Sequence, residues 1–195
     1  MCHALVTVFA IGVAIGHEMI ADTNCFFDDR MDALRCRGSD LAGIRSAVGQ
    51  KLGQIAVLDI NFCEVPEIAE PLFVAPDSSD PDLSSTDLRS VSIVNSGLEV
   101  IAEDAFAGVG GQLEELDLSG NLLADLPTAV LNLTRLVTLD LSRNRIGKLP
   151  HGSAFNSLNT LVRLDLSENR LGAKSTNKAP YSLLVTRRIP HSLAD

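Results

Sequence analysis

The sequence predicts an α/β solenoid, a stack of repeats with a parallel β-sheet on its concave face and short helical or 3₁₀ turns on its convex face. The first observation behind this prediction is the phrase LDLS, which occurs at Leu116–Ser119, Leu139–Ser142 and Leu164–Ser167 and each time precedes x-Asn. The second is composition, because 46% of the residues are hydrophobic but only 4% are aromatic and none is tryptophan. The core must therefore be aliphatic, and leucine spacing should carry the signal of the fold.

Residues 1–21 are predicted to be a secretory signal peptide. Ala4–Gly16 is an apolar run of thirteen residues, which is shorter than the roughly 20 residues of a membrane-spanning helix and typical of a signal-peptide core. Cleavage is expected after Ala21, or alternatively after Gly16. The segment lacks the lysine or arginine that usually precedes such a core, and a buried N-terminal strand or helix is the other interpretation. No second apolar run reaches about 20 residues, so the sequence predicts no membrane span.

One spacing can be traced through six copies. The three strongest copies read Leu-x-x-Leu-x-Leu-x-x-Asn and end at Asn121, Asn144 and Asn169. Three looser copies precede them and share the same frame: Met31, Leu34, Cys36, Ser39; Ile55, Leu58, Ile60, Cys63; and Leu88, Val91, Ile93, Ser96. Their last residues lie 23 to 25 positions apart, except for the step of 33 from Cys63 to Ser96. An acidic insertion rich in proline and serine, residues 70–87, accounts for that longer step.

Each copy predicts one short strand. Leu-x-Leu places two side chains on one face of a strand, and stacking such strands on their neighbours supplies backbone hydrogen bonds and a shared core. All strands then run parallel, so the chain must return over the opposite side. There, apolar residues about three apart predict helical or 3₁₀ turns: Leu123, Leu126, Val130, Leu133, Ile146, Leu149, Phe155 and Leu158. We expect Asn121, Asn144 and Asn169 to be structural, since a carboxamide supplies both a donor and an acceptor to a buried turn.

The repeated phrase L-x-x-L-x-L-x-x-N-x-L resembles the leucine-rich repeat family, in its extracellular subtype of about 24 residues, over roughly Met31 to Leu171. The resemblance implies a leucine-rich repeat solenoid of about six repeats. The segment CFFDDRMDALRCRGSDLAGI is similar to the N-terminal cysteine cap of that family and implies a Cys25–Cys36 disulfide, although the usual cap has four cysteines. Cys63 would then be a buried or intermolecular thiol. The C-terminal cysteine cap of the family is missing.

The sequence therefore divides into four predicted regions. These are a signal peptide at 1–21, the cap with the first degenerate repeat at 22–44, the repeats at 45–172 and a non-repeat tail at 173–195. The last repeat strand, Leu161 to Leu166, is predicted to have an unpaired outer edge, and exposed strand edges invite association with other chains. Either the tail covers this edge by an irregular contact or the edge pairs with another chain. We expect a weakly held tail and self-association through this uncapped end.

The charge and motifs of the chain exclude several functions. With 25 acidic and 16 basic residues the formal charge is −9, and such a chain lacks the basic footprint of a nucleic-acid-binding protein. The four histidines have no metal-ligand spacing, no serine or cysteine stands in a known nucleophile motif, and no glycine-rich phosphate loop is present. The sequence predicts neither an enzyme nor a cofactor or metal site.

The exposed strand positions are the candidate contact residues for a protein partner: Glu114, Glu115, Asp117, Thr138, Asp140, Arg143, Arg163, Asp165 and Glu168. Among them, Asp117, Asp140 and Asp165 should form a column on the concave face, which Asp59 extends and Ser92 interrupts. This column is either a site for a basic partner or a cation, or a solvated sheet surface, and the second interpretation is favoured.

The family resemblance implies a secreted or cell-surface module that binds a protein ligand in adhesion, receptor or innate-recognition roles. The alternatives are a structural matrix protein of the small proteoglycan kind and an N-terminal fragment of a longer receptor ectodomain. The sequon Asn132-Leu133-Thr134 predicts glycosylation of Asn132 if the chain is exported.

Overall fold

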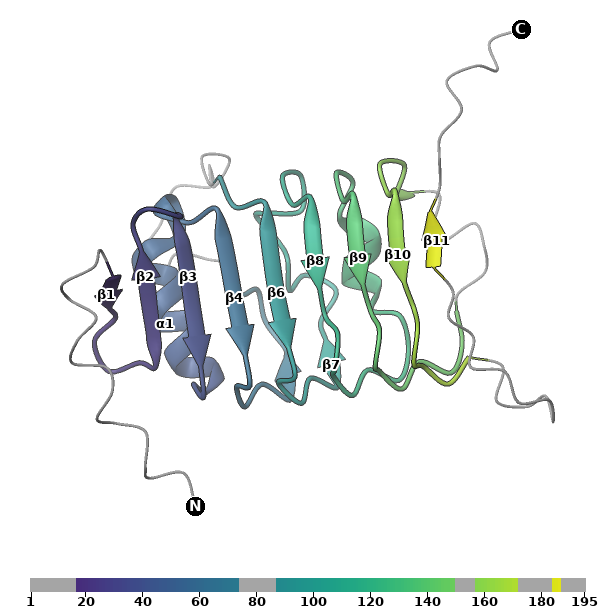
Figure 1. The fold of residues 1–195 in the computed structure, drawn as a ribbon, viewed down its shortest axis with the longest axis horizontal. Coiled ribbons are helices and arrows are strands. Elements are labelled where there is room, and N and C mark those ends of the chain that lie inside the picture. The colour runs from purple at the N-terminus through teal and green to yellow at the C-terminus, as the bar shows by residue number, and fades with distance from the viewer. Residues whose placement is uncertain (1–16, 74–86, 150–156, 172–183, 187–195) are drawn as a thin grey trace, which may run out of the picture.

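The computed structural model describes residues 17–73, 87–149, 157–171 and 184–186. Nine strands form one sheet in the order β1-β2-β3-β4-β6-β8-β9-β10-β11 (Figure 1). Their bounds are β1 His17–Met19, β2 Cys25–Asp28, β3 Ala33–Arg37, β4 Val57–Asn61, β6 Ser90–Val94, β8 Glu115–Asp117, β9 Thr138–Asp140, β10 Arg163–Asp165 and β11 Leu184–Thr186. The strands from β3 to β10 come from the six predicted repeats.

These six repeat strands pair with one another in parallel. The register aligns the repeat positions, so that Leu34, Leu58, Val91, Leu116, Leu139 and Leu164 form one row behind the sheet. All six side chains are buried in a single aliphatic core. The predicted repeat solenoid with a parallel sheet is therefore confirmed.

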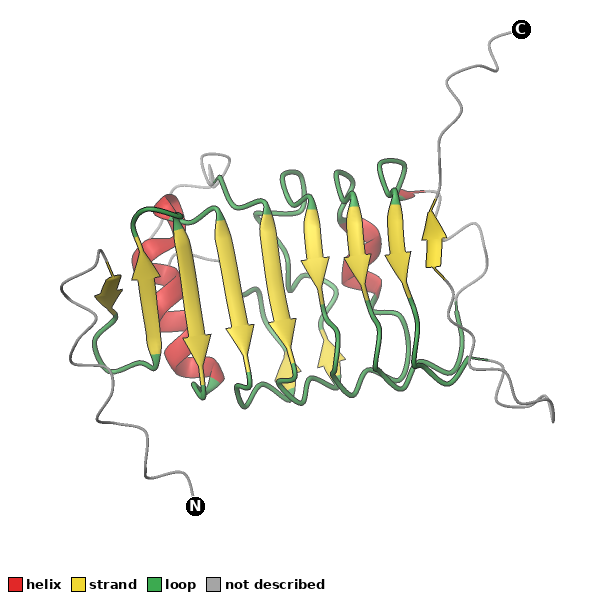
Figure 2. Cartoon of the chain, viewed as in Figure 1, coloured by secondary structure: helices red, strands yellow, loops and turns green. Residues whose placement is uncertain are grey.

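The helices of the described residues lie behind the sheet (Figure 2). They are the α-helix α1 Leu41–Lys51 and the 3₁₀ helices η2 Leu52–Gln54 and η4 Thr128–Asn132. A small parallel sheet of β5 Glu67–Ile68 and β7 Val100–Ile101 lies on the same side. Only short turns were predicted here, and α1 is longer. Asp40 caps it by accepting the Gly43 N–H at 2.8 Å, and its buried residues Ile44, Ala47 and Val48 fall on one helical face.

The N-terminal end of the stack is closed by an antiparallel hairpin. β2 pairs with β3 so that Cys25 lies opposite Cys36, and the expected disulfide joins them. The prediction that Met31 occupies an inward repeat position is wrong, because Met31 is 60% exposed. It lies in the turn between β2 and β3. Among the described residues no preceding repeat packs against this turn, so its side chain is not buried.

β1 belongs to the segment that was assigned to the signal peptide. It pairs antiparallel with β2, and the Ile20 side chain that follows it is buried in the core. Glu18 also forms an ion pair with Lys51 at the end of α1. Cleavage after Ala21 would remove these contacts, whereas cleavage after Gly16 would keep them.

The C-terminal edge of the stack is paired. β11 lies antiparallel to β10, with Leu164 opposite Val185, so the prediction of an uncapped, unpaired edge at Leu161–Leu166 is wrong. The pairing uses backbone groups alone and needs no repeat spacing in the tail. The signal-peptide core, most of the acidic insertion, Phe155 and the remainder of the tail lie outside the described residues.

Candidate functional site

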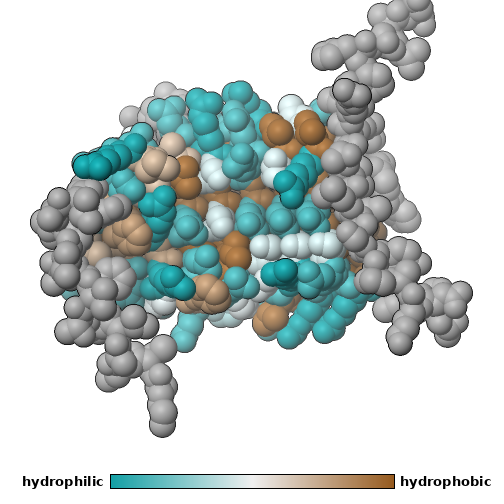
Figure 3. Space-filling view, in the orientation of Figure 1, coloured by the Kyte–Doolittle hydropathy of each residue, from teal (hydrophilic) through white to brown (hydrophobic). Residues whose placement is uncertain are grey.

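The concave face of the sheet is open. Side chains alternate between buried and half-buried along β4, β6 and β9. In Figure 3 hydrophilic residues extend across this face, with hydrophobic residues between and beside them. Parallel sheets are almost always covered on both faces. Here the described helices cover only the back (Figure 2), which leaves a broad polar surface for another molecule.

The register orders this surface into rows. The central row runs through Arg35, Asp59, Ser92, Asp117, Asp140 and Asp165. The adjacent row runs through Val57, Ser90, Glu115, Thr138 and Arg163. Six of the nine predicted contact residues therefore share the open face, namely Glu115, Asp117, Thr138, Asp140, Arg163 and Asp165.

The other three predicted contact residues lie beyond the strand ends. Glu114 precedes β8 and is 3.4 Å from Arg89 and 3.8 Å from Arg135. Arg143 and Glu168 follow β9 and β10 and form an exposed ion pair of 3.1 Å across adjacent repeats. They occupy the rim of the concave face rather than its floor.

The recurrent aspartates have a local structural task. Each accepts the backbone N–H of the serine two residues later: Ser119 to Asp117 at 2.8 Å, Ser142 to Asp140 at 2.9 Å and Ser167 to Asp165 at 2.9 Å. This bond satisfies a donor where the strand ends. Within the described residues no group of three or more histidine, cysteine or acidic side chains is placed to hold a metal ion. The geometry favours a solvated surface over a cation site.

Asp59 differs from the three later aspartates. It has no such serine, and burial raises the pKa of its carboxyl. Arg35 opposes this effect, Asp117 adds to the rise and Arg37 lowers the pKa again. The charge of Asp59 is thus costly, and it lies where the acidic row meets two arginines.

A buried ladder of polar residues follows the strands. Asn144 accepts the Leu123 N–H through Oδ1 at 3.1 Å and donates through Nδ2 to the Leu118 and Leu141 carbonyls at 2.9 and 3.1 Å. Asn121 and Asn169 bridge adjacent repeats in the same manner. Each amide therefore ties its own turn to the repeat before it.

Cys63 takes the place of asparagine in this ladder. Its thiol donates to the Cys36 carbonyl at 3.4 Å, and its N–H donates to Ser96 Oγ at 3.2 Å. Burial raises the pKa of the thiol, so Cys63 is held in its neutral, poorly reactive form.

The residue before each ladder position has a left-handed backbone. The six φ values are +65° at Gly38, +52° at Phe62, +52° at Asn95, +69° at Gly120, +56° at Arg143 and +56° at Glu168. Backbone bonds between repeats hold this turn, as when the Phe62 N–H donates to the Val94 carbonyl at 3.2 Å. Glycine and asparagine adopt this conformation readily, but a bulky aromatic residue does so rarely.

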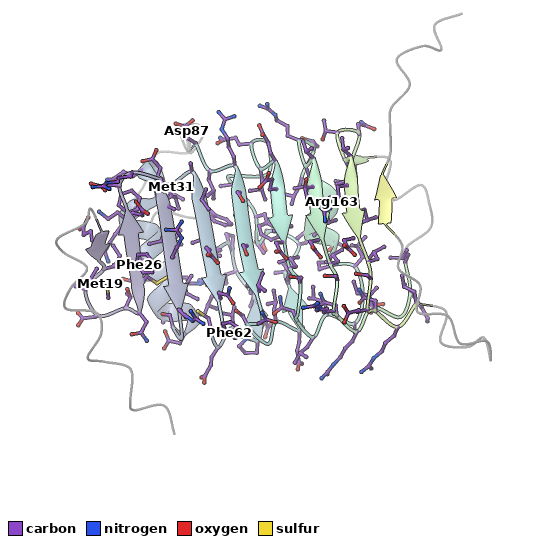
Figure 4. All side chains as sticks on the ribbon, viewed as in Figure 1. Met19, Phe26, Met31, Phe62, Asp87 and Arg163 are labelled. Atoms are coloured by element: carbon purple, nitrogen blue, oxygen red, sulfur yellow. A yellow bond between two sulfur atoms is a disulfide. The ribbon has the colours of Figure 1, made fainter. Side chains whose placement is uncertain are left out.

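Sequence reasoning missed an aromatic–arginine patch at the N-terminal end of the concave face, made of Met19, Phe26, Arg35, Arg37 and Phe62. The Arg35 guanidinium lies 6.0 Å from the Phe26 ring centre, and that of Arg37 lies 5.2 Å from the Phe62 ring centre. Figure 4 shows Met19 and Phe26 at one end of the sheet and Phe62 at the edge where the strands end. Aligning the position before each turn asparagine would have shown Phe62 where other repeats have Gly120 or Arg143.

Asn132, in the predicted sequon, lies on the convex side. It ends η4, and its side chain is exposed while that of Leu133 is buried. No helix among the described residues has the length and apolar character needed to cross a membrane.

Comparisons with known proteins place the repeats in context. The family model described as "Leucine rich repeat" matches residues 86–146. The chain is 30% identical over 119 residues to the Homo sapiens protein "Leucine-rich repeats and immunoglobulin-like domains protein 1", covering 60% of this chain and 10% of that protein. It is 27% identical over 134 residues to the Caenorhabditis elegans "Leucine-rich repeat-containing protein egg-6", covering 68% and 12%. The chain thus spans about a tenth of the length of these relatives.

Two solved structures are also similar. One is a leucine-rich repeat protein of Leptospira interrogans, with 26% identity, a TM-score of 0.46 and coverage of 64% of this chain and 28% of that chain. The other is an internalin of Listeria monocytogenes, with 19% identity, a TM-score of 0.42 and coverage of 64% and 32%.

Proposed function

The chain is a leucine-rich repeat protein, and from that premise we propose that it is a non-catalytic module whose concave sheet binds a protein partner. The observation that carries the proposal is the open face of the parallel sheet, with its rows of half-buried polar side chains. Neighbouring strands hold these side chains at fixed spacing, so the surface needs little reordering on binding, and preorganised surfaces lose less entropy.

We further propose that the protein acts outside the cell or at its surface. Disulfides persist in oxidising compartments, and the Cys25–Cys36 bridge supports such a setting. A signal peptide ending at Gly16 would leave β1 and the buried Ile20 in the mature chain. The exposed Asn132 would then carry a glycan on the convex side, away from the binding surface.

Site-directed photo-cross-linking tests the binding face. A photoreactive benzoylphenylalanine would replace Thr138, on the concave strand β9, or Thr128, which is exposed on the convex helix η4. Each version would be irradiated on cells that produce the protein. The proposal expects a discrete protein adduct from the Thr138 version and none from the Thr128 version. Adducts from Thr128 alone, or equal adducts from both, would contradict it.

A further inference from the structure

The concave face is not uniform, and we propose that the aromatic–arginine patch anchors the partner. We infer that this patch takes a protein segment that combines carboxylate side chains with apolar ones. The inference rests on the proposed function and names the part of the face that supplies the affinity, together with the chemistry of its occupant.

Phe62 is the first observation. Its side chain is 55% exposed although its backbone is left-handed, with φ of +52°. The Phe62 N–H donates to the Val94 carbonyl and its carbonyl accepts the Gly38 N–H, each at 3.2 Å, so the backbone cannot relax. A phenylalanine that is neither buried nor suited to its backbone contributes little to folding, and strained exposed residues cluster at binding sites.

The arginines define the charge of the occupant. Arg37 is exposed and forms no ion pair among the described residues, its guanidinium being engaged by the Phe62 ring. The Arg35 guanidinium forms an ion pair with the buried Asp28 carboxylate at 3.2 Å and lies over the Phe26 ring. Guanidinium groups beside aromatic rings retain their donors for a carboxylate. Exposed aromatic and arginine side chains are also the types that dominate binding energy at protein interfaces.

An unpaired acceptor lies beside these groups. Asn61 Oδ1 is buried and has no hydrogen-bond partner among the described residues, and Asn61 pairs in register with Arg37 and precedes Phe62. Buried acceptors without donors are costly. A partner that shifts Arg37 or Phe62 and brings an N–H group would remove that cost.

The rest of the concave face limits where an acidic segment can lie. Beyond β4 the central row carries Asp117, Asp140 and Asp165, which repel a carboxylate-bearing chain. Attraction at the patch and repulsion along the row together confine this acidic segment, but not the rest of the partner, to the β1–β4 end. Specific interfaces commonly combine these two effects.

A displayed library of random peptides, sorted for binding to the full chain, tests the inference. Enriched peptides are expected to carry aspartate or glutamate together with large apolar residues. Their affinity should fall by at least about tenfold for Phe62→Asn and for Arg37→Gln, and should be unchanged for the matched control Arg45→Gln in helix α1, behind the sheet. Phe62→Asn should melt at or above the wild-type temperature, because Asn95 holds the equivalent position in the next repeat.

The inference would be overturned by no enrichment, by peptides that bind Phe62→Asn undiminished, or by a loss of stability in Phe62→Asn that explains its loss of binding. Enrichment of basic peptides that bind the Asp140→Asn variant more weakly than the wild type would also overturn the inference. That result would still support the proposal that the concave sheet binds a protein partner. Failure of the proposed function is seen separately, as the absence of a preferred adduct from Thr138.

Discussion

Asn144 shows how one side chain joins two repeats. It is 6% exposed. Its side-chain amide accepts a hydrogen bond from the Leu123 N–H and donates to the carbonyls of Leu118 and Leu141. A buried polar residue that is fully satisfied fixes the geometry of the stack more than it adds to the core.

Asn144→Ala is expected to lower the free energy of unfolding by about 1–3 kcal/mol, because several buried backbone groups lose their partner. The neighbouring Arg143→Ala should cost within about 0.5 kcal/mol, since it removes only an exposed ion pair with Glu168. Urea denaturation of both variants measures the two values. Equal losses would show that the inward and outward assignment of this turn is wrong.

Asp59→Asn is expected to raise the melting temperature at pH 7. Burial raises the pKa of Asp59 in the folded state above its ordinary value of 3.8, so the native state binds the proton more tightly than the unfolded chain does. The contribution of Asp59 to the stability of the fold is then lost as pH rises from 3.8 through the pKa of Asp59 in the folded state. The neutral amide avoids that loss, and the two melting temperatures should converge at a pH below 3.8.

The control for this titration is Asp140→Asn. Asp140 already accepts the Ser142 N–H at 2.9 Å, and an amide oxygen accepts such a bond no better than a carboxylate does. No gain at pH 7 is expected from this variant. A gain for Asp59→Asn that stayed the same at pH 3 and pH 7 would show that packing, rather than ionisation, is its cause.

At the scale of single residues, the sequence predicted the inward positions of the strong repeats and the turn asparagines. It did not reveal the aromatic–arginine patch. In the repeat frame, the residue before each turn position is a variable surface position. The sequence alone does not reveal that the backbone φ of Phe62 is +52° or that Arg37 lies over the Phe62 ring. Those facts arise from bonds between repeats, which only the folded stack displays.

At the scale of elements, side-chain periodicity predicted the six repeat strands β3, β4, β6, β8, β9 and β10. It could not predict β1, β11 or the β5–β7 pair, because these short strands lack the apolar-x-apolar spacing of the repeat strands and pair through the backbone. Helix α1 did carry signals, namely Asp40 at its N-cap and the spacing of Ile44, Ala47 and Val48. The repeat frame did not predict the helix, because this frame contains only short turns on the convex side.

The strand β1 yields a prediction about processing. A chain that begins at His17 keeps β1, Ile20 and the Glu18–Lys51 pair, whereas a chain that begins at Asp22 loses them. Because burying an isoleucine is worth about 1.5–3 kcal/mol, the Asp22 version should unfold at clearly lower denaturant. Mass spectrometry of the exported protein should accordingly find His17 as its first residue.

The matched control is Glu18→Gln in the longer version. Glu18 is largely exposed, so breaking its pair with Lys51 should cost less than about 1 kcal/mol. If the Asp22 version were as stable as the His17 version, β1 would have no part in the native core, and cleavage after Ala21 would again be the better prediction.

At the scale of the whole molecule, each repeat contacts only its neighbours, so stability should spread along the stack in steps. The two ends are closed differently. The N-terminal end has a disulfide, a hairpin and helix α1, whereas among the described residues β10 is followed in the sheet by the three-residue strand β11 alone. Protection against hydrogen exchange should therefore be strongest in the strands around β4 and β6 and weakest at β10.

Ending the chain at Gly172 tests both this gradient and the role of β11. Removing β11 exposes the backbone edge of β10, so the amide of Leu164 should exchange faster, those of β9 should change less, and those of β3 and β4 should be unaffected. The same exposed edge should let the shortened protein associate with itself, as unpaired strand edges do, and light scattering would detect a concentration-dependent mass. Equal acceleration in every strand would mean that the stack unfolds as one unit. Unchanged exchange in β10 together with an unchanged mass would mean that β11 does not protect this edge.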